Sequence, residues 1–133
     1  MATPITLSEY NQLGFQIIGA AMAVQDEFGF GLLEEVYREA FIMELMQRNI
    51  RVKSEQQINV HYKGMPIGKQ FRLDLLVEDA IIVELKAVES LHPKHFSQLN
   101  TYLKIADKKL GYLINFHTHP LKNGIHRVIN GYF

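Results

Sequence analysis

Two acidic residues and a lysine lie near one another in a largely apolar stretch of the chain. Asp74 stands ten residues before Glu84, and Lys86 follows two residues later. Carboxylate oxygens are the ligands that hard divalent cations such as Mg²⁺ prefer. A lysine beside such a cation can orient or help to deprotonate an attacking water. The spacing predicts a metal site that hydrolyses a phosphate ester, with Asp74, Glu84 and Lys86 as its catalytic residues.

A β-hairpin is the element that would bring these side chains together. Apolar segments rich in β-branched residues flank positions 78–80, which predicts a three-residue loop. If Val77 lies opposite Ile81, Asp74 faces Glu84, and facing Cβ atoms of antiparallel strands are about 4.5–5.5 Å apart. Because side chains alternate along a strand, the acids and the lysine share one face, and the other face is apolar core. A cross-strand ion pair on a solvated sheet face explains the same pattern.

A third acid precedes the hairpin on an expected helix. Glu34 and Tyr37 are three residues apart, so they share one helix face. If that face points toward the sheet, Glu34 completes the metal site. The alternative is a surface acid beside a half-buried tyrosine.

More polar residues follow the hairpin. His95, Gln98 and Tyr102 are spaced by three and four residues, which places them on one stripe of an expected helix. Such a stripe beside a metal site would contact phosphate or nucleobase, and the alternative is the wet side of an amphipathic helix. Arg127, on the last expected strand, is a candidate phosphate ligand or a surface salt-bridge partner.

The composition indicates an ordinary globular chain. Its 133 residues predict one domain over 1–133, and 47% hydrophobic content is too high for a disordered chain. Fourteen basic and fourteen acidic residues cancel, which lowers the expectation of tight non-specific DNA binding. No apolar run is long enough for a membrane span, no secretory signal is apparent and cysteine is absent. We expect a cytoplasmic protein.

The periodicity of apolar residues predicts an α/β fold of the order ααββββαββ, with a mixed central β-sheet flanked by helices. The expected helices span 6–27, 32–48 and 92–107, and the expected strands span 50–53, 58–62, 69–77, 81–87, 110–116 and 126–129.

The motifs, taken in order, resemble those of the GxxExxY proteins, a group within the PD-(D/E)XK nuclease-like superfamily. Gly31, Glu34 and Tyr37 form the naming motif. The resemblance covers nearly the whole chain and extends to Tyr62-Lys63-Gly64, Asp74-Leu75-Leu76-Val77, Val83-Glu84-Leu85-Lys86-Ala87, Gln98 with Tyr102-Leu103-Lys104, and Leu113-Ile114-Asn115-Phe116. It departs at Leu73, which stands where the superfamily motif has proline.

This resemblance implies a restriction-endonuclease-like fold and Mg²⁺- or Mn²⁺-dependent cleavage of phosphodiester bonds in DNA or RNA, and we expect DNA more than RNA. It implies that Glu34, Asp74 and Glu84 bind the metal and that Lys86 is the catalytic lysine. Gln98 and Tyr102 match the glutamine-x-x-x-tyrosine feature of RecB-like exonucleases, which lies beside the active site. The predicted substrate-binding residues are Gln98, Tyr102, His95, Tyr37 and Arg127.

The neutral charge and small size leave an alternative of another class open. A catalytically silent nuclease-fold module would bind nucleic acid or a protein partner without cleaving. A homodimer or a partner subunit that completes the binding groove is compatible with either function.

Overall fold

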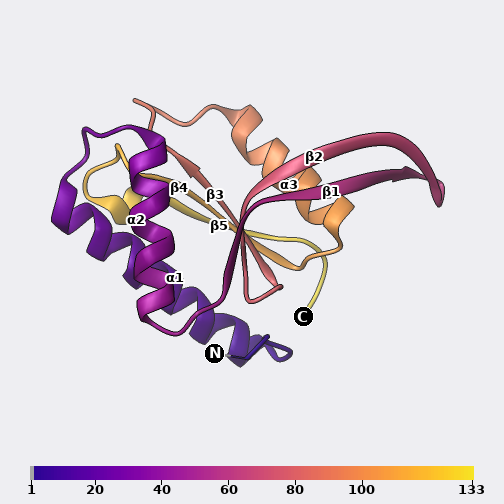
Figure 1. The fold of residues 1–133 in the computed structure, drawn as a ribbon, viewed down its shortest axis with the longest axis horizontal. Helices are drawn as coiled ribbons and strands as arrows, with labels where there is room; N and C mark the ends of the chain where they lie inside the picture. The colour runs from indigo at the N-terminus through magenta and orange to yellow at the C-terminus, as the bar shows by residue number, and fades with distance from the viewer. Residues whose placement is uncertain (1) are drawn as a thin grey trace.

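The structure is a computed structural model that describes residues 2–133. The elements are α1 Leu7–Phe28, α2 Glu34–Gln47, β1 Val52–Tyr62, β2 Met65–Val77, β3 Ile81–Lys86, α3 Pro93–Ala106, β4 Leu110–Asn115, a 3₁₀ turn η1 Leu121–Gly124 and β5 Ile125–Ile129. The strands form one sheet in the order β1-β2-β3-β4-β5, in which β3 and β4 are parallel and the other neighbours antiparallel (Figure 1). The expected mixed α/β class is confirmed. No helix within residues 2–133 is long and apolar enough to cross a membrane.

Helices cover both faces of the sheet. α1 and α2 pack into one buried cluster that includes Val83 of β3, and α3 packs into a second cluster that includes Ile82. Leu76 of β2 is buried in the second cluster as well. The expectation that only one face of the β2–β3 hairpin is core is therefore wrong. A central strand with helices on both sides is apolar on both faces, apart from the positions at its end.

β1 is longer than expected. The predicted strands 50–53 and 58–62 belong largely to this one strand, because the polar residues 54–57 between them also lie along β2. Three strands instead of four precede α3, and the sheet has five strands instead of six. Pairing with a partly buried neighbour holds a polar segment in extended form, and a polar sequence does not reveal that context.

β1 and β2 continue beyond the body of the protein as a projecting hairpin (Figure 1). We call residues 57–70 the arm. Its tip is a two-residue turn in which Lys63 and Gly64 have φ of 50° and 80°, and Tyr62 pairs with Met65. Two consecutive positive φ angles are typical of the type I′ turns whose twist matches that of a hairpin. The turn therefore favours a regular, twisted ribbon at the end of the arm.

The two N-terminal helices begin in different ways, and the start of α2 determines where the predicted site residue Glu34 lies. α1 begins with a capping box, in which Thr6 Oγ1 accepts from the Glu9 amide at 3.2 Å and Glu9 Oε1 accepts from the Thr6 amide at 3.1 Å. α2 has no side-chain cap, and its first turn instead carries Glu34 and Glu35. Negative side chains there interact favourably with the helix dipole. Glu34 is thus the first residue of its helix.

Candidate active site at the fork between β2 and β3

The candidate site lies where β2 separates from β3. The two strands pair at only three positions, from Leu75 opposite Val83 to Val77 opposite Ile81. Beyond them β2 leaves with β1 toward the arm, and β3 continues beside β4. A pocket of about 260 Å³ occupies this fork, and its lining is almost wholly polar. The lining residues are Glu34, Arg38, Glu55, Arg72, Leu73, Asp74, Glu84, Lys86, Gln98 and Tyr102.

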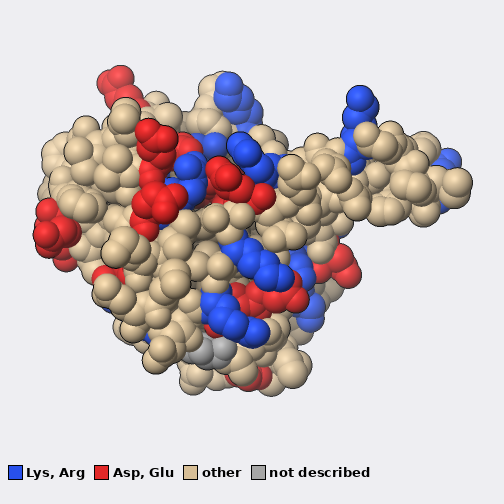
Figure 2. Space-filling model, in the orientation of Figure 1, with Lys and Arg blue, Asp and Glu red and all other residues tan. Residues whose placement is uncertain are grey.

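Charge distinguishes this pocket from a larger hollow along α1. A hollow of about 670 Å³ along α1 is lined by Leu7, Ser8, Asn11, Gln12, Phe15 and Gln16, and none of these side chains is ionisable near neutral pH. Around the fork, acidic and basic side chains gather between α2 and the base of the arm (Figure 2). Chemistry at a phosphate needs such groups, so the smaller pocket is the candidate site.

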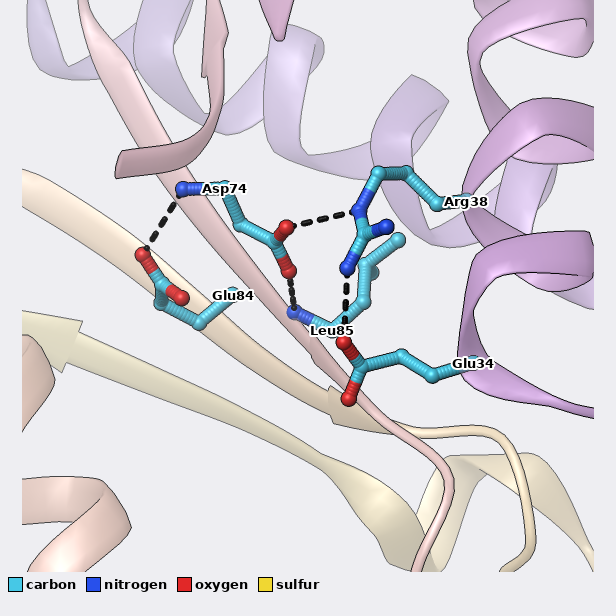
Figure 3. Close-up of polar contacts among 5 residues, drawn as sticks. All are labelled: Glu34, Arg38, Asp74, Glu84 and Leu85. Atoms are coloured by element: carbon cyan, nitrogen blue, oxygen red, sulfur yellow. Dashed lines mark hydrogen bonds and ion pairs between the residues drawn. The ribbon is translucent and has the colours of Figure 1, made fainter. Parts of the chain in front are cut away.

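The two acids predicted to face each other meet in the fork. The Asp74 amide donates to Glu84 Oε1 at 3.2 Å, and the Leu85 amide donates to Asp74 Oδ2 at 2.9 Å (Figure 3). The three-residue loop and its register are those expected from the sequence. The two carboxylates hydrogen-bond to the backbones of the facing strands, which holds both acids at the mouth of the fork.

Glu84 is a buried acid beside another acid. Its exposed fraction is 6%. Burial, followed by the negative charge of Asp74, raises the pKa of Glu84 to about 7, and the positive charge of Lys86 opposes this rise. A carboxylate in these surroundings is destabilised in its charged form, and a cation placed between the acids would relieve it.

Arg38 is a central residue of the site that we did not predict. It extends from α2, and its Nε donates to Asp74 Oδ1 at 2.7 Å while Nη2 donates to Glu34 Oε2 at 2.6 Å (Figure 3). Burial lowers the pKa of Arg38, but the charge and hydrogen bond of Asp74, together with the charges of Glu34 and Glu55, outweigh burial and raise it. The spacing of four residues between Glu34 and Arg38 was a signal for this ion pair.

Glu55 is a fourth acid that we did not predict. It lies in β1 between Ser54, which pairs with Leu75, and Gln56, which pairs with Leu73. Its φ is 53°, which is rare for a residue other than glycine and costs about 1–3 kcal/mol. At the same point the alternation of β2 shifts, since Leu73 packs in the α3 cluster and Leu75 in the other. An acid held in a strained backbone conformation in the pocket wall points to a functional position. The polar residues around Glu55 in the sequence gave no indication of a strand that would carry it to the site.

Lys86, Gln98 and Tyr102 line the same pocket as the acids. Lys86 is half-buried at the end of β3, and the other two extend from α3. The Tyr102 ring stacks on Phe71 with centroids 4.3 Å apart, which fixes it at the base of the arm. Burial, and then the charge of Glu84, raise the pKa of Tyr102 and keep its hydroxyl a proton donor. The structure thus brings six predicted residues together: Glu34, Asp74, Glu84, Lys86, Gln98 and Tyr102.

Tyr37 lies away from this pocket. Its ring is fully buried and stacks on Phe116 with centroids 4.6 Å apart. Its hydroxyl donates to the Gly29 carbonyl at 2.7 Å and accepts from the Leu32 amide at 3.2 Å. These bonds tie the loop before α2 to the helix itself. Tyr37 therefore supports the position of Glu34, and its contacts are not those of a substrate-binding residue.

His95 and Arg127 do not line the pocket either. His95 Nδ1 accepts from the His92 amide at 3.1 Å as part of the cap of α3, and burial, then the charge of Lys86, lower its pKa. Arg127 is exposed on β5 and donates to Asn11 Oδ1 at 3.0 Å. The site is consequently built from α2, the first three strands and α3.

The predicted metal ligands are close together but not arranged as a metal centre. Among residues 2–133, no group of three His, Cys, Asp or Glu side chains has the geometry to hold a metal ion. Arg38 lies between Glu34 and Asp74 and uses one oxygen of each. Carboxylate oxygens and the destabilised charge of Glu84 nonetheless match the chemistry of a hard divalent cation.

The protein combines a mixed sheet that has helices on both faces with an acidic fork that has a lysine between two strands. These two features characterise the restriction-endonuclease-like class of fold. Residues 11–128 match the family model of the PD-(D/E)XK nuclease superfamily. The chain belongs to this superfamily. No curated protein matches it.

Proposed function

We propose that the protein is a Mg²⁺- or Mn²⁺-dependent nuclease that hydrolyses phosphodiester bonds, with DNA as the preferred substrate. The observation that carries this proposal is the pocket in the fork, where Asp74, Glu84 and Lys86 meet the helix-borne Glu34. Membership of a nuclease superfamily supports the reaction class. We also propose that the chain belongs to the GxxExxY branch, on the basis of Gly31, Glu34 and Tyr37.

Glu34, Asp74 and Glu84 are the proposed metal ligands. When bound, the cation would polarise the phosphate and lower the pKa of a water molecule. Glu84 gains most from this arrangement, because it is buried beside Asp74 and has a pKa of about 7. A divalent cation would hold Glu84 ionised at neutral pH.

Arg38 competes for the same oxygens. Its guanidinium neutralises Asp74 and Glu34 in the structure, so a cation must displace at least one of its ion pairs. An arginine released from a carboxylate has a planar set of donors that suits a phosphate oxygen pair. We therefore propose that Arg38 changes partner from the acids to the substrate phosphate when the cation binds.

The remaining lining residues act on water and substrate. Lys86 is the proposed group that orients the attacking water and offsets charge on the phosphate. Gln98 and Tyr102 approach from α3, and both can donate hydrogen bonds to phosphate or nucleobase. Tyr102 is held by its stack on Phe71, so its hydroxyl is in a fixed position.

One observation favours a second function, a nuclease-fold module that binds nucleic acid or a protein without cleaving it. Arg38 already supplies a positive charge between Glu34 and Asp74, so these acids are satisfied without a metal. Such a module would bind no cation in the fork. A homodimer or partner subunit suits either function, and the cysteine-free composition supports a cytoplasmic location.

Calorimetric titration with Mn²⁺ separates the two functions. A nuclease binds Mn²⁺ in the fork, and Asp74→Ala abolishes that binding, whereas Asp26→Ala, which removes an exposed acid of α1, does not. Cleavage of DNA and RNA oligonucleotides with Mn²⁺ is then measured on the same proteins. Absence of Mn²⁺ binding at millimolar concentration, with and without oligonucleotide, would refute the enzyme function.

A further inference from the structure

The arm, residues 57–70, is a long exposed ribbon with charge of one sign. It projects from the body, and every residue from 61 to 70 is exposed (Figures 1 and 2). Its sequence contains Lys63 and Lys69 and no Asp or Glu, although the whole chain has as many acidic as basic residues. The distal arm in Figure 2 accordingly shows basic atoms and no acidic ones. This local separation of charge suits a polyanionic partner.

One face of the arm continues the wall of the pocket. Arg72 lines the pocket and pairs with Gln57, and two residues further along the ribbon Asn59 pairs with Gln70. Because side chains alternate, these four share one face. Amide and guanidinium groups are the side chains that contact phosphates and base edges. From Arg72 to Met65 near the tip, the ribbon extends about 23 Å, roughly two-thirds of a turn of B-form DNA.

The opposite face of the ribbon is anchored at its base. Phe71 pairs with Ile58 on that face and stacks on Tyr102 of α3. Tyr102 also lines the pocket. The anchor fixes the direction of the arm relative to the site, and the amide-bearing face, on which Gln70 Nε2 donates to Asn59 Oδ1 at 2.7 Å, is exposed.

Features of the arm disfavour a second copy of the chain as its partner. Pro66 and Lys69 lie in the strand, and the register shifts where Gly68 has φ of 68°. Proline, lysine and bulges are the features by which proteins prevent edge strands from pairing with another chain. Met65 and Ile67 remain 68% and 49% exposed near the tip, and apolar side chains of this kind contact thymine methyl groups or base steps.

We propose that the arm binds in the groove of duplex DNA and positions the backbone at the fork. The major groove of B-form DNA is wide enough for a two-stranded β-ribbon, whereas the major groove of duplex RNA is too narrow. DNA held in this way is the substrate of the pocket, so this assignment rests on the nuclease function proposed above.

Fluorescence anisotropy with labelled duplex DNA in Ca²⁺ buffer tests the arm. The variant Lys63→Glu/Lys69→Glu reverses both of its lysines, and Lys53→Glu/Lys109→Glu makes the same charge change on exposed residues at the other end of the sheet. We expect the arm variant to bind at least about tenfold more weakly, with a salt slope smaller by about two. The control variant should stay within about twofold of the wild type.

Four results would overturn the assignment. The first is equal DNA affinity of the arm variant and the wild type, and the second is an equal loss in the control variant. The third is a wild-type dimer that the arm variant converts to a monomer in sedimentation, which would make the arm an interface between copies. Wild-type affinity for duplex RNA equal to that for duplex DNA would overturn the groove assignment as well.

A small phosphodiester separates this assignment from the nuclease function. Bis(p-nitrophenyl) phosphate fits a pocket but does not reach the arm, so its Mn²⁺-dependent hydrolysis by the wild type and loss in Asp74→Ala test the pocket alone. No hydrolysis, together with arm-dependent DNA binding, would refute the nuclease function and support the arm. Hydrolysis together with arm-independent DNA binding would refute the arm only.

Discussion

Arg38 Nε donates to Asp74 Oδ1 at 2.7 Å across the mouth of the fork between β2 and β3. This contact joins α2 to the sheet at the residue on which the proposed metal site is centred. Arg38 also contacts Glu34, so one guanidinium satisfies two proposed metal ligands. The proposed function therefore depends on an exchange between Arg38 and a divalent cation.

Removal of this guanidinium should strengthen cation binding. In Arg38→Ala no guanidinium competes for the oxygens of Asp74 and Glu34, so we expect the Mn²⁺ dissociation constant from calorimetry to fall by about tenfold or more. Arg48→Ala is the matched control. Arg48 makes a similar ion pair with Glu44, at 2.8 Å, but at the C-terminal end of α2, away from the pocket. Weaker Mn²⁺ binding in Arg38→Ala would show that Arg38 supports the metal site instead of competing with it.

The pKa of Glu84 predicts a pH dependence of stability in the absence of divalent cations. The folded protein holds this carboxyl at a pKa of about 7, above its ordinary value of 4.5. Between these values the folded state binds more protons than the unfolded state, so the free energy of unfolding falls as pH rises from about 4.5 to about 7. Above pH 7 Glu84 is ionised in the folded state, and the resulting decrease in the free energy of unfolding is complete and amounts to at most about 3 kcal/mol.

Glu84→Gln tests this dependence in urea titrations at pH 5 and pH 8. The variant should lose less stability than the wild type between the two pH values, because glutamine does not ionise. Asp26→Asn, at an exposed position of α1, should behave as the wild type. An identical pH dependence in Glu84→Gln and the wild type would contradict the raised pKa.

Lys86→Ala should separate cation binding from the chemical step. Lys86 lines the pocket but is not a proposed ligand, so the Mn²⁺ dissociation constant should change little. Loss of a group that orients the attacking water should slow single-turnover cleavage of DNA by about 100-fold. Lys109→Ala, which removes an exposed lysine outside the pocket, should cleave at the wild-type rate. Wild-type cleavage by Lys86→Ala would assign the activity to another site.

Tyr37→Phe should affect stability and leave DNA affinity unchanged. The change keeps the stack on Phe116 and removes the hydrogen bonds to Gly29 and Leu32, which should cost about 1–3 kcal/mol in urea unfolding. Tyr132→Phe, at a side chain that is 93% exposed, should be neutral. A loss of DNA affinity without a loss of stability would restore the predicted substrate-binding role of Tyr37.

The meeting of Asp74 and Glu84 could be predicted because local rules determine it. Residues 78–80 between two apolar segments indicate the loop length, and the loop length determines which residues of β2 and β3 lie opposite each other. Gln98 and Tyr102 followed from helical spacing, and their place in the pocket depends on α3 packing beside β3. Each of these predictions needs only one element and its immediate neighbour.

Glu55 and the burial of Leu76 could not be predicted in this way. Glu55 reaches the site because β1 extends along β2 through a polar segment that has no strand signal of its own. Leu76 is buried because α3 covers the face that we expected to be polar. Both depend on contacts between elements distant in sequence, and periodicity within one segment does not report them.

The most direct test of the proposed metal site is a crystal structure of the protein with Mn²⁺, examined by anomalous scattering. We expect an anomalous peak in the fork, within coordination distance of oxygens from Glu34, Asp74 and Glu84, and an Arg38 side chain displaced from Asp74. Saturating Mn²⁺ with no peak in the fork, and Arg38 still bonded to Asp74, would contradict the nuclease function and leave the non-catalytic module as the function of this fold.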